Sequence, residues 1–209
     1  MRGQNGFTVF LVDDDASILR AISRLLTLEK FETRCFLSAG DFIAGYDPTA
    51  PSCALIDIAM DGFNGLQLQD HLLAHGIDTP IIFLTGKGDI SSSVKAMKAG
   101  AVDFLTKPVA RSDLLAAITK AMTIDDQRRH RRADLHSINT RLAALTPRER
   151  EVFEHVVAGR LNKQIAGALG IVEKTVKVHR KHMMEKLGVR TVADLVRLSI
   201  RISIDKPDL

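Results

Sequence analysis

The chain has 209 residues, of which 45% are hydrophobic and 26% charged, which suits one large or two small folded domains. It contains no Trp and only one Tyr, which argues against binding nucleic acid by aromatic stacking. No run approaches the ~18 apolar residues that cross a membrane. The apolar run nearest the N-terminus, residues 7–12, is too short for a signal peptide and is followed by three aspartates. We therefore expect a cytoplasmic protein with no membrane partner.

Charge is distributed unevenly along the chain. Residues 1–122 carry 11 Lys and Arg against 14 Asp and Glu, residues 123–145 carry 5 against 3, and residues 146–209 carry 13 against 8. An acidic front and a basic back predict two domains with different partners, and the back one suits a polyanion.

Hydrophobic patterning predicts alternating strands and helices over the first 122 residues. This alternation indicates an α/β domain, with a doubly wound, five-stranded parallel sheet covered on both faces. Cys35 and Cys53 fall in predicted strands, where we expect two small buried side chains and no disulfide. The expected strands are 7–12, 31–36, 53–58, 80–85 and 102–105, and the expected helices begin near residues 16, 38, 66, 90 and 111.

Polar side chains follow several of these strands. Asp13 and Asp14 follow the first, Asp57 and Thr85 end the third and fourth, and Lys107 follows the fifth. Because the carboxyl ends of parallel strands share one edge, we expect these side chains to converge. Clustered carboxylates raise one another's pKa without a cation, and their oxygens suit Mg²⁺. With a hydroxyl and an ammonium group beside them, they predict phosphoryl transfer to a carboxylate nucleophile, Asp57.

Residues 7 to about 122 resemble the receiver domain of two-component response regulators. The resemblance rests on Asp13 and Asp14, on Asp57 with Met60 and Gly65, on Thr85 with Gly86, and on residues 95–101 and 103–108. It implies a CheY-like, flavodoxin-like sheet with strand order 2-1-3-4-5. It also implies that a sensor histidine kinase transfers phosphate from its phosphohistidine to Asp57.

The same resemblance implies roles for the residues around Asp57. Asp14 and Asp57 would bind Mg²⁺ directly, Asp13 through water, and Ala59 through its carbonyl oxygen. Lys107 would pair with the acyl phosphate, and its bond to Pro108 would be cis. Thr85 would hydrogen-bond the phosphoryl group, and Phe104 would turn inward behind Thr85.

The chain departs from this family at two positions. Asp61 stands where the family usually has Pro, which adds a negative charge near the pocket and loosens the loop. Asp57 remains the expected nucleophile, but the Mg²⁺ affinity and the lifetime of the phosphoryl group do not follow from the family pattern. Gly86 stands where Ala is common, which leaves more room for a phosphodonor. Asp15 we assign to capping the first helix and not to metal binding.

Residues 123–144 form the predicted helical linker. Two alternatives remain open for it: a long helix that pairs weakly across a dimer, or a hinge near Arg128 and Arg131. Apolar residues with heptad spacing favour the helix, and these are Leu114, Ala117, Ala121, Ile124, Leu135, Ile138, Leu142 and Leu145.

Residues 145–209 form the predicted back domain, a small all-α unit of four helices. Thr146, Pro147 and Glu149 are typical of a helix start with a capping box. Glycines interrupt the helical pattern, and helix, Gly-containing turn, helix is helix-turn-helix geometry. The expected helices run to 159, over 162–169, over 173–187 and over 192–200.

The third of these helices has two different faces. Val176, His179, Met183 and Leu187 share the face that we expect to pack on the other helices. The opposite face is basic around one apolar residue, which suits phosphates, guanine edges and a thymine methyl in a major groove. It consists of Lys174, Lys177, Val178 and Lys181.

Residues 146–151, 162–166, 175–182 and 186–187 resemble the LuxR/NarL/FixJ-type DNA-binding domain. The resemblance implies that Lys177, Val178 and Lys181 face bases in double-stranded DNA. Asn162, Lys174 and Thr175 would then contact the DNA backbone, and the last helix would form the dimer contact.

Together the two halves predict a transcription regulator that dimerises and binds DNA when Asp57 is phosphorylated, with RNA polymerase as a candidate partner. Two other classes of protein share part of this pattern. An aspartate-nucleophile phosphatase would need a second Asp two residues after its nucleophile, but Ala59 stands there. A DNA-binding protein regulated without phosphate is disfavoured by the complete acidic pocket, although Asp61 leaves it open.

Overall fold

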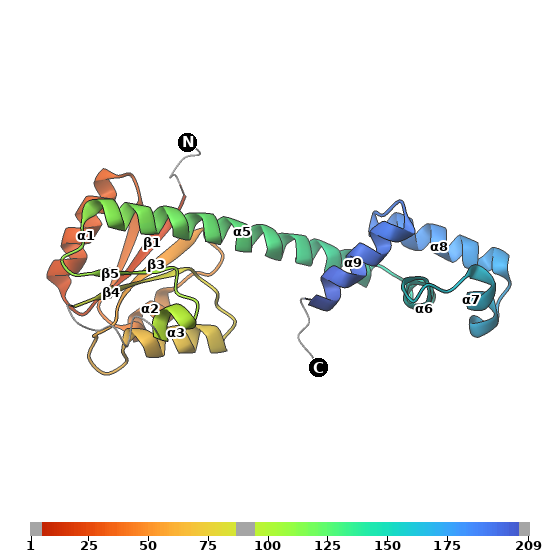
Figure 1. The fold of residues 1–209 in the computed structure, drawn as a ribbon, viewed down its shortest axis with the longest axis horizontal. Helices are drawn as coiled ribbons and strands as arrows, with labels where there is room; N and C mark the ends of the chain where they lie inside the picture. Colours follow the sequence, from red (N-terminus) through yellow and green to blue (C-terminus); the bar gives the residue numbers. More distant parts are fainter. Residues whose placement is uncertain (1–5, 87–94, 205–209) are drawn as a thin grey trace. The chain divides into compact units, whose positions relative to one another are not determined.

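The computed structural model describes residues 6–86 and 95–204 (Figure 1). The chain divides into two compact units, residues 1–129 and 130–209. No described helix is both long enough and apolar enough to span a membrane.

The first unit is built on a five-stranded parallel sheet. Its order is β2-β1-β3-β4-β5, as the resemblance to receiver domains implied. All six residues of the central strand β3 are buried, because strands lie on both sides of it and helices on both faces. The strands are β1 (Thr8–Val12), β2 (Glu32–Phe36), β3 (Ser52–Asp57), β4 (Ile81–Thr85) and β5 (Asp103–Thr106).

Helices cover both faces of the sheet (Figure 1). Helix α1 (Ala16–Leu28) and the start of α5 (Arg111–Ala143) pack on one face, in a core with Leu11, Leu55 and Leu114. Helices α2 (Ala39–Gly45) and α3 (Gly65–Ala74) cover the other face. Residues 95–98 are helical, and the first part of the predicted helix 90–99 lies outside the described residues.

Local side-chain caps begin these helices. The Asp15 carboxylate accepts the Ser17 N–H at 2.7 Å, which confirms its predicted role as the cap of α1. Ser38 caps α2 in the same way. Asn64 and Gln67 form a reciprocal capping box at α3, the helix that follows the loop after β3.

The prediction for the two cysteines is half correct. Cys53 is fully buried in β3, but Cys35 is exposed. The reason is topological: β2 forms the edge of the sheet, so its side chains are less covered than those of a central strand. Strand β1 lies between β2 and β3, and both cysteines are free thiols.

Helix α5 runs without a break through the arginine-rich stretch where a hinge was the alternative. Within the first unit, α5 contacts the end of the sheet where the strands begin, opposite the end that carries Asp57. The buried Asp125 carboxylate accepts the Ser52 N–H at the start of β3, and burial raises the pKa of Asp125. Arg128 donates to the Asp78 carbonyl oxygen and Arg129 to that of Thr49. The border between the units therefore falls after Arg129, and the predicted borders at 122 and 145 stay a prediction.

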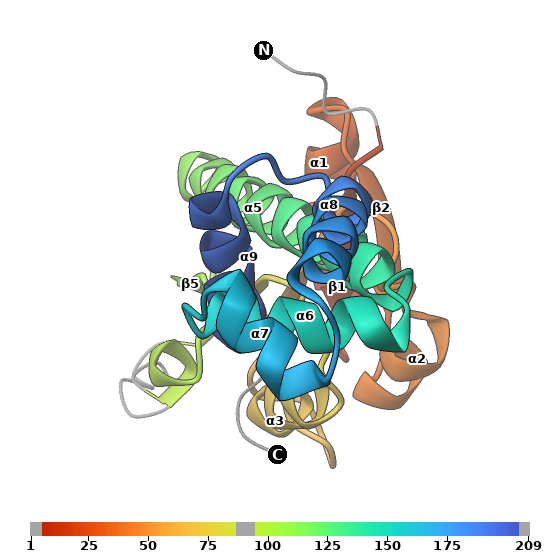
Figure 2. The ribbon, with the colours of Figure 1, turned by 90° about the vertical axis from the view of Figure 1, so that its right-hand side faces the viewer.

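After the end of α5, the described residues of the second unit form helices α6 to α9, and Figure 2 shows α7 and α8 on consecutive stretches of chain. Gly170 and Gly188 end α7 and α8 with φ of 65° and 67°, a backbone conformation that favours glycine. Val152, Ile165, Val176, Met183 and Leu195 meet in one core. The helices are α6 (Pro147–Val157), α7 (Asn162–Leu169), α8 (Glu173–Leu187) and α9 (Val192–Ile204).

Candidate functional site

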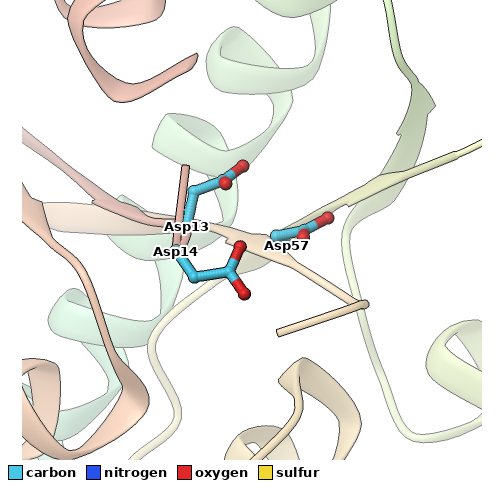
Figure 3. A group of neighbouring side chains, drawn as sticks. All are labelled: Asp13, Asp14 and Asp57. Carbon is cyan, nitrogen blue, oxygen red and sulfur yellow. The ribbon is translucent and has the colours of Figure 1, made fainter. Parts of the chain in front are cut away.

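Three aspartates meet at the carboxyl edge of the sheet. Because β1 and β3 pair in parallel, with Val12 opposite Ile56, the residues that follow β1 lie beside Asp57. One carboxylate oxygen each from Asp13, Asp14 and Asp57 lies within 4.8 Å of the others (Figure 3). Asp13 and Asp57 are buried, and Asp14 is exposed. Three hard oxygen donors with one side open to solvent fit Mg²⁺, which keeps part of its water shell.

Lys107 supplies a cation to this cluster. Its Nζ lies 2.7 Å from Asp13 Oδ2 and 2.9 Å from Asp57 Oδ1. It directly follows β5, and its bond to Pro108 is cis, as the resemblance implied. Burial lowers the pKa of Lys107, but hydrogen bonds to both carboxylates raise the pKa above its ordinary value. Lys107 therefore stays a charged ammonium group between two buried acids.

The surroundings of Asp57 disfavour its charge and raise its pKa. Burial raises its pKa, and the neighbouring Asp13 charge adds to that rise. Lys107 and a hydrogen bond from the Ala59 N–H oppose the rise without cancelling it. A carboxylate held this way has few water molecules to shed before it attacks an electrophile.

Thr85 and Phe104 differ in burial. Thr85 ends β4, is buried, and donates its hydroxyl to the Gly86 carbonyl at 3.1 Å. The Lys107 N–H donates to the Thr85 carbonyl at 2.7 Å, so the ends of β4 and β5 hold these two residues together. The Phe104 side chain is 40% exposed, so its ring lies outward in this structure.

Two features of the loop after β3 leave no pattern in the sequence. A Cβ on Gly65 would lie 2.3 Å from the Asp57 carbonyl oxygen, so only glycine allows α3 to approach the strand this closely. The Asp61 N–H donates to Asp14 Oδ2 at 3.2 Å. The sequence showed the negative charge of Asp61 but gave no signal for the contact made by its backbone.

The predicted two faces of the third back-domain helix, α8, are confirmed by burial. Val176, Met183 and Leu187 are buried in the core of the second unit, and His179 is partly buried. The four residues of the opposite face, Lys174, Lys177, Val178 and Lys181, are exposed. We call these four residues the basic face of α8.

Two exposed ion pairs and a hydrogen bond between helices lie at this surface. Lys177 lies 3.3 Å from Glu173 and Lys181 lies 3.9 Å from Glu185, both one turn away on the same helix. Asn162, predicted to contact the DNA backbone, accepts a 2.6 Å hydrogen bond from Arg180. Arg180 joins α8 to α7, and no periodicity in the sequence singled it out. Thr175, the remaining predicted contact, is partly buried near the start of α8.

Two families match the chain, one for each unit. Response regulator receiver domain matches residues 9–119. Bacterial regulatory proteins, luxR family, matches residues 143–199.

Curated proteins match over nearly the whole length. Nodulation protein W of Bradyrhizobium diazoefficiens is 40% identical over 210 residues, which cover 97% of this chain and 92% of that protein. Response regulator protein TodT of Pseudomonas putida is 40% identical over 194 residues, covering 93% and 86%. Transcriptional regulatory protein FixJ of B. diazoefficiens is 35% identical over 193 residues, covering 92% and 94%.

Solved structures agree with these relatives. The structure of response regulator StyR has a TM-score of 0.82 at 41% identity and covers 94% of this chain and 99% of that one. Full-length FixJ from B. japonicum has a TM-score of 0.57 at 34% identity, with coverage of 97% and 99%. The chain therefore belongs to the two-component response regulators that carry a receiver domain and a LuxR-type DNA-binding domain, a class of transcription factors.

Proposed function

We propose that a sensor histidine kinase phosphorylates Asp57, and that the phosphorylated protein dimerises and binds specific DNA sequences to regulate transcription. The observation that carries this proposal is the buried Asp57 carboxylate, 2.9 Å from Lys107 Nζ and within a cluster of two further carboxylates. A carboxylate nucleophile, a fixed cation and a set of metal donors are the parts that phosphoryl transfer needs.

In the proposed reaction an Asp57 oxygen attacks the phosphorus of a phosphohistidine. The phosphorus–nitrogen bond breaks, and its electron pair passes to the leaving imidazole. Asp13, Asp14, Asp57 and the Ala59 carbonyl would hold Mg²⁺, which when bound neutralises charge on the phosphoryl oxygens. Lys107 turns from Asp57 to a phosphoryl oxygen. The Thr85 hydroxyl gives up its hydrogen bond to the Gly86 carbonyl and donates to a second phosphoryl oxygen.

Movement of Thr85 toward the phosphoryl group leaves space behind it, which the exposed Phe104 ring fills by turning inward. We assign dimer formation to the face built by the predicted helix 90–99, β5 and the start of α5. For dephosphorylation, a water molecule would attack the phosphorus, and the bond between phosphorus and the Asp57 oxygen would break. The electron pair of that bond would return to the Asp57 carboxylate, and inorganic phosphate would leave with the oxygen of the water.

The basic face of α8 carries the proposed DNA contacts. Lys177, Val178 and Lys181 face base edges in the major groove, and their exposure on one face supports this role. Asn162, Lys174 and Thr175 contact the DNA backbone, and α9 pairs with a second copy. RNA polymerase is a further candidate partner, and a kinase and DNA as partners would place the protein in the cytoplasm.

The test is to mix the full chain with acetyl phosphate and Mg²⁺ and to measure its intact mass. A stable gain of one phosphoryl group, absent in Asp57→Asn, is the expected result. Continuous turnover of phosphomonoesters would indicate a phosphatase instead. A chain that gains no phosphoryl group yet binds DNA would indicate regulation by some other signal.

A further inference from the structure

The carboxylates of the acidic pocket differ in how firmly they are held. Asp13 accepts the Asp15 N–H at 2.9 Å and Lys107 at 2.7 Å. Asp57 accepts from Lys107 and from the Ala59 N–H. Asp14 is exposed, and within the described part of the chain its carboxylate has one hydrogen-bond donor, the backbone N–H of Asp61 at 3.2 Å. That single contact links the loop after β1 to the loop after β3.

The loop that presents this N–H is fixed on both sides. Met60 is only 6% exposed and packs in the core beneath the sheet. Gly62 has a φ of 75°, which favours glycine and sets the turn immediately after Asp61. Further along, the Gly65 N–H donates to the Ile58 carbonyl at 3.2 Å. A donor held between such anchors has a defined direction and can hold the carboxylate that it meets.

We propose that the backbone amide of Asp61 is a positioning group for Mg²⁺ binding, because it orients Asp14 with one oxygen toward the pocket. The amide donates to Oδ2, and one Asp14 oxygen lies within 4.8 Å of an oxygen from each of Asp13 and Asp57. Hydrogen-bond partners of metal ligands fix the orientation of the ligand, and removing one typically weakens metal binding 10- to 100-fold. This inference rests on the proposed function, since it concerns the same Mg²⁺ site.

The identity of residue 61 decides whether this contact exists. Proline has no N–H, so it cannot donate to Asp14, whereas every other residue can. Two effects of Asp61 can therefore be separated by substitution. Asp61→Asn keeps the amide and removes the charge, Asp61→Ala keeps the amide and removes the side chain, and Asp61→Pro removes both.

The experiment is calorimetric titration of the full chain and these three variants with Mg²⁺ alone. Asp61→Ala and Asp61→Pro form the matched pair, because both lack the carboxylate and differ in the amide. We expect Asp61→Pro to bind Mg²⁺ at least ~10-fold more weakly than Asp61→Ala. Thermal melting in EDTA checks that the variants are folded.

A second measurement does not depend on the proline variant folding. Hydrogen exchange of the Asp61 amide should be slow in the unaltered chain and faster in Asp14→Ala, which removes the acceptor. Equal Mg²⁺ affinity in the matched pair, or an Asp61 amide whose exchange ignores Asp14→Ala, overturns the inference. Either result leaves the proposed function intact if the unaltered chain still binds Mg²⁺ and takes up phosphate at Asp57. A chain that does neither would overturn both.

Discussion

The raised pKa of Asp57 has a consequence for stability. Because burial and the Asp13 charge raise its pKa, the folded state binds a proton at Asp57 more tightly than the unfolded state does. The stability that this proton supplies is complete below the unfolded pKa of about 3.9 and is lost as pH rises through the higher folded pKa. At neutral pH the unphosphorylated, metal-free protein is thus less stable than it would be with an uncharged side chain of the same shape at position 57.

We therefore predict that Asp57→Asn raises the melting temperature in EDTA. Asparagine has the same shape without the charge, and Lys107 keeps its 2.7 Å contact with Asp13. The gain should grow with pH above about 4 and shrink when Mg²⁺ is added, since ligand binding stabilises only the unaltered pocket. Scanning calorimetry over this pH range measures it, and a variant that melts below the parent at neutral pH in EDTA would contradict it.

Gly65 is constrained by the close approach of α3 to strand β3. A Cβ there meets the Asp57 carbonyl oxygen at 2.3 Å, and a backbone atom can yield only if β3 or α3 moves. Gly65→Ala should cost ~1–3 kcal/mol or more in urea unfolding. The matched control is Gly40→Ala in helix α2, where the nearest atom is 3.8 Å away and alanine should stabilise the helix by ~0.5–1 kcal/mol. Similar effects from both substitutions would show that the close approach is not the cause.

At the scale of elements, the contacts of α5 define how much chain the receiver needs. Asp125 accepts the Ser52 N–H at the start of β3, and Arg128 and Arg129 donate to two loop carbonyls. A fragment ending at residue 122 loses all three contacts, and one ending at 130 keeps them. We predict that fragment 1–122 is less stable than 1–130 by at least ~2 kcal/mol in urea, since one hydrogen bond to a charged group contributes ~1.5–3 kcal/mol.

The control for this prediction is made in the full chain. Asp125→Ala should lower the stability of the first unit, while Gln127→Ala, at an exposed position of the same helix, should change it little. Fragments of equal stability would place the structural end of the receiver before Asp125, as the sequence suggested.

Helices α6 and α8 are joined by one buried acid. The Glu149 carboxylate accepts the Thr146 N–H at 2.8 Å and lies 2.6 Å from Lys186 Nζ. Burial raises the pKa of Glu149, but these bonds outweigh it and lower the pKa from 4.5 to about 2. A lowered folded pKa gives stability that is present above 4.5 and lost as pH falls toward 2.

We predict that Glu149→Gln destabilises the second unit at pH 7 by ~2 kcal/mol and flattens its stability profile below pH 4.5. Glu151→Gln is the control, because the Glu151 side chain is 48% exposed beside Arg148 and surface pairs contribute less than ~1 kcal/mol. Hydrogen exchange of α6 and α8 amides, followed against pH, measures both. An unchanged profile in Glu149→Gln would assign the acid sensitivity to other groups.

The elements were predictable from sequence to different degrees. The strand ends could be placed because each apolar run stops at a polar residue, and parallel pairing then brings Asp13, Asp57 and Lys107 together. The exposure of Cys35 could not be read from its own strand, because it depends on which strand forms the edge. The Asp61 amide and the Arg128 contact join segments 47 and 50 residues apart through backbone atoms, which carry no pattern in the side-chain sequence.

At the scale of the whole molecule, charge differs between the two halves. The receiver half carries more acids than bases, and residues 146–209 carry 13 bases against 8 acids. We expect the acidic half to compete electrostatically with DNA for the basic half, or to keep two copies apart. Phosphorylation then needs to shift that equilibrium by only ~1–3 kcal/mol.

We predict that residues 145–209 alone bind DNA without phosphate, because the basic face of α8 and its supporting helices lie within this fragment. The unphosphorylated full chain should bind more weakly and the phosphorylated chain at least as tightly. A dimer that places two α8 helices one DNA turn apart would read an inverted repeat with centres ~10 base pairs apart. Gel-shift titration of the three proteins against one such DNA measures this.

Two lysines of the basic face distinguish base reading from charge attraction in the same titration. Lys177→Ala should relax base preference by ~1–3 kcal/mol at one position in each half-site, because the proposed DNA complex places this side chain against base edges. Lys174→Ala should weaken binding to every sequence alike and reduce the salt dependence, because a phosphate contact carries no sequence information. If the fragment fails to bind where the phosphorylated chain binds tightly, dimerisation of the receiver supplies the affinity and relief of masking is wrong.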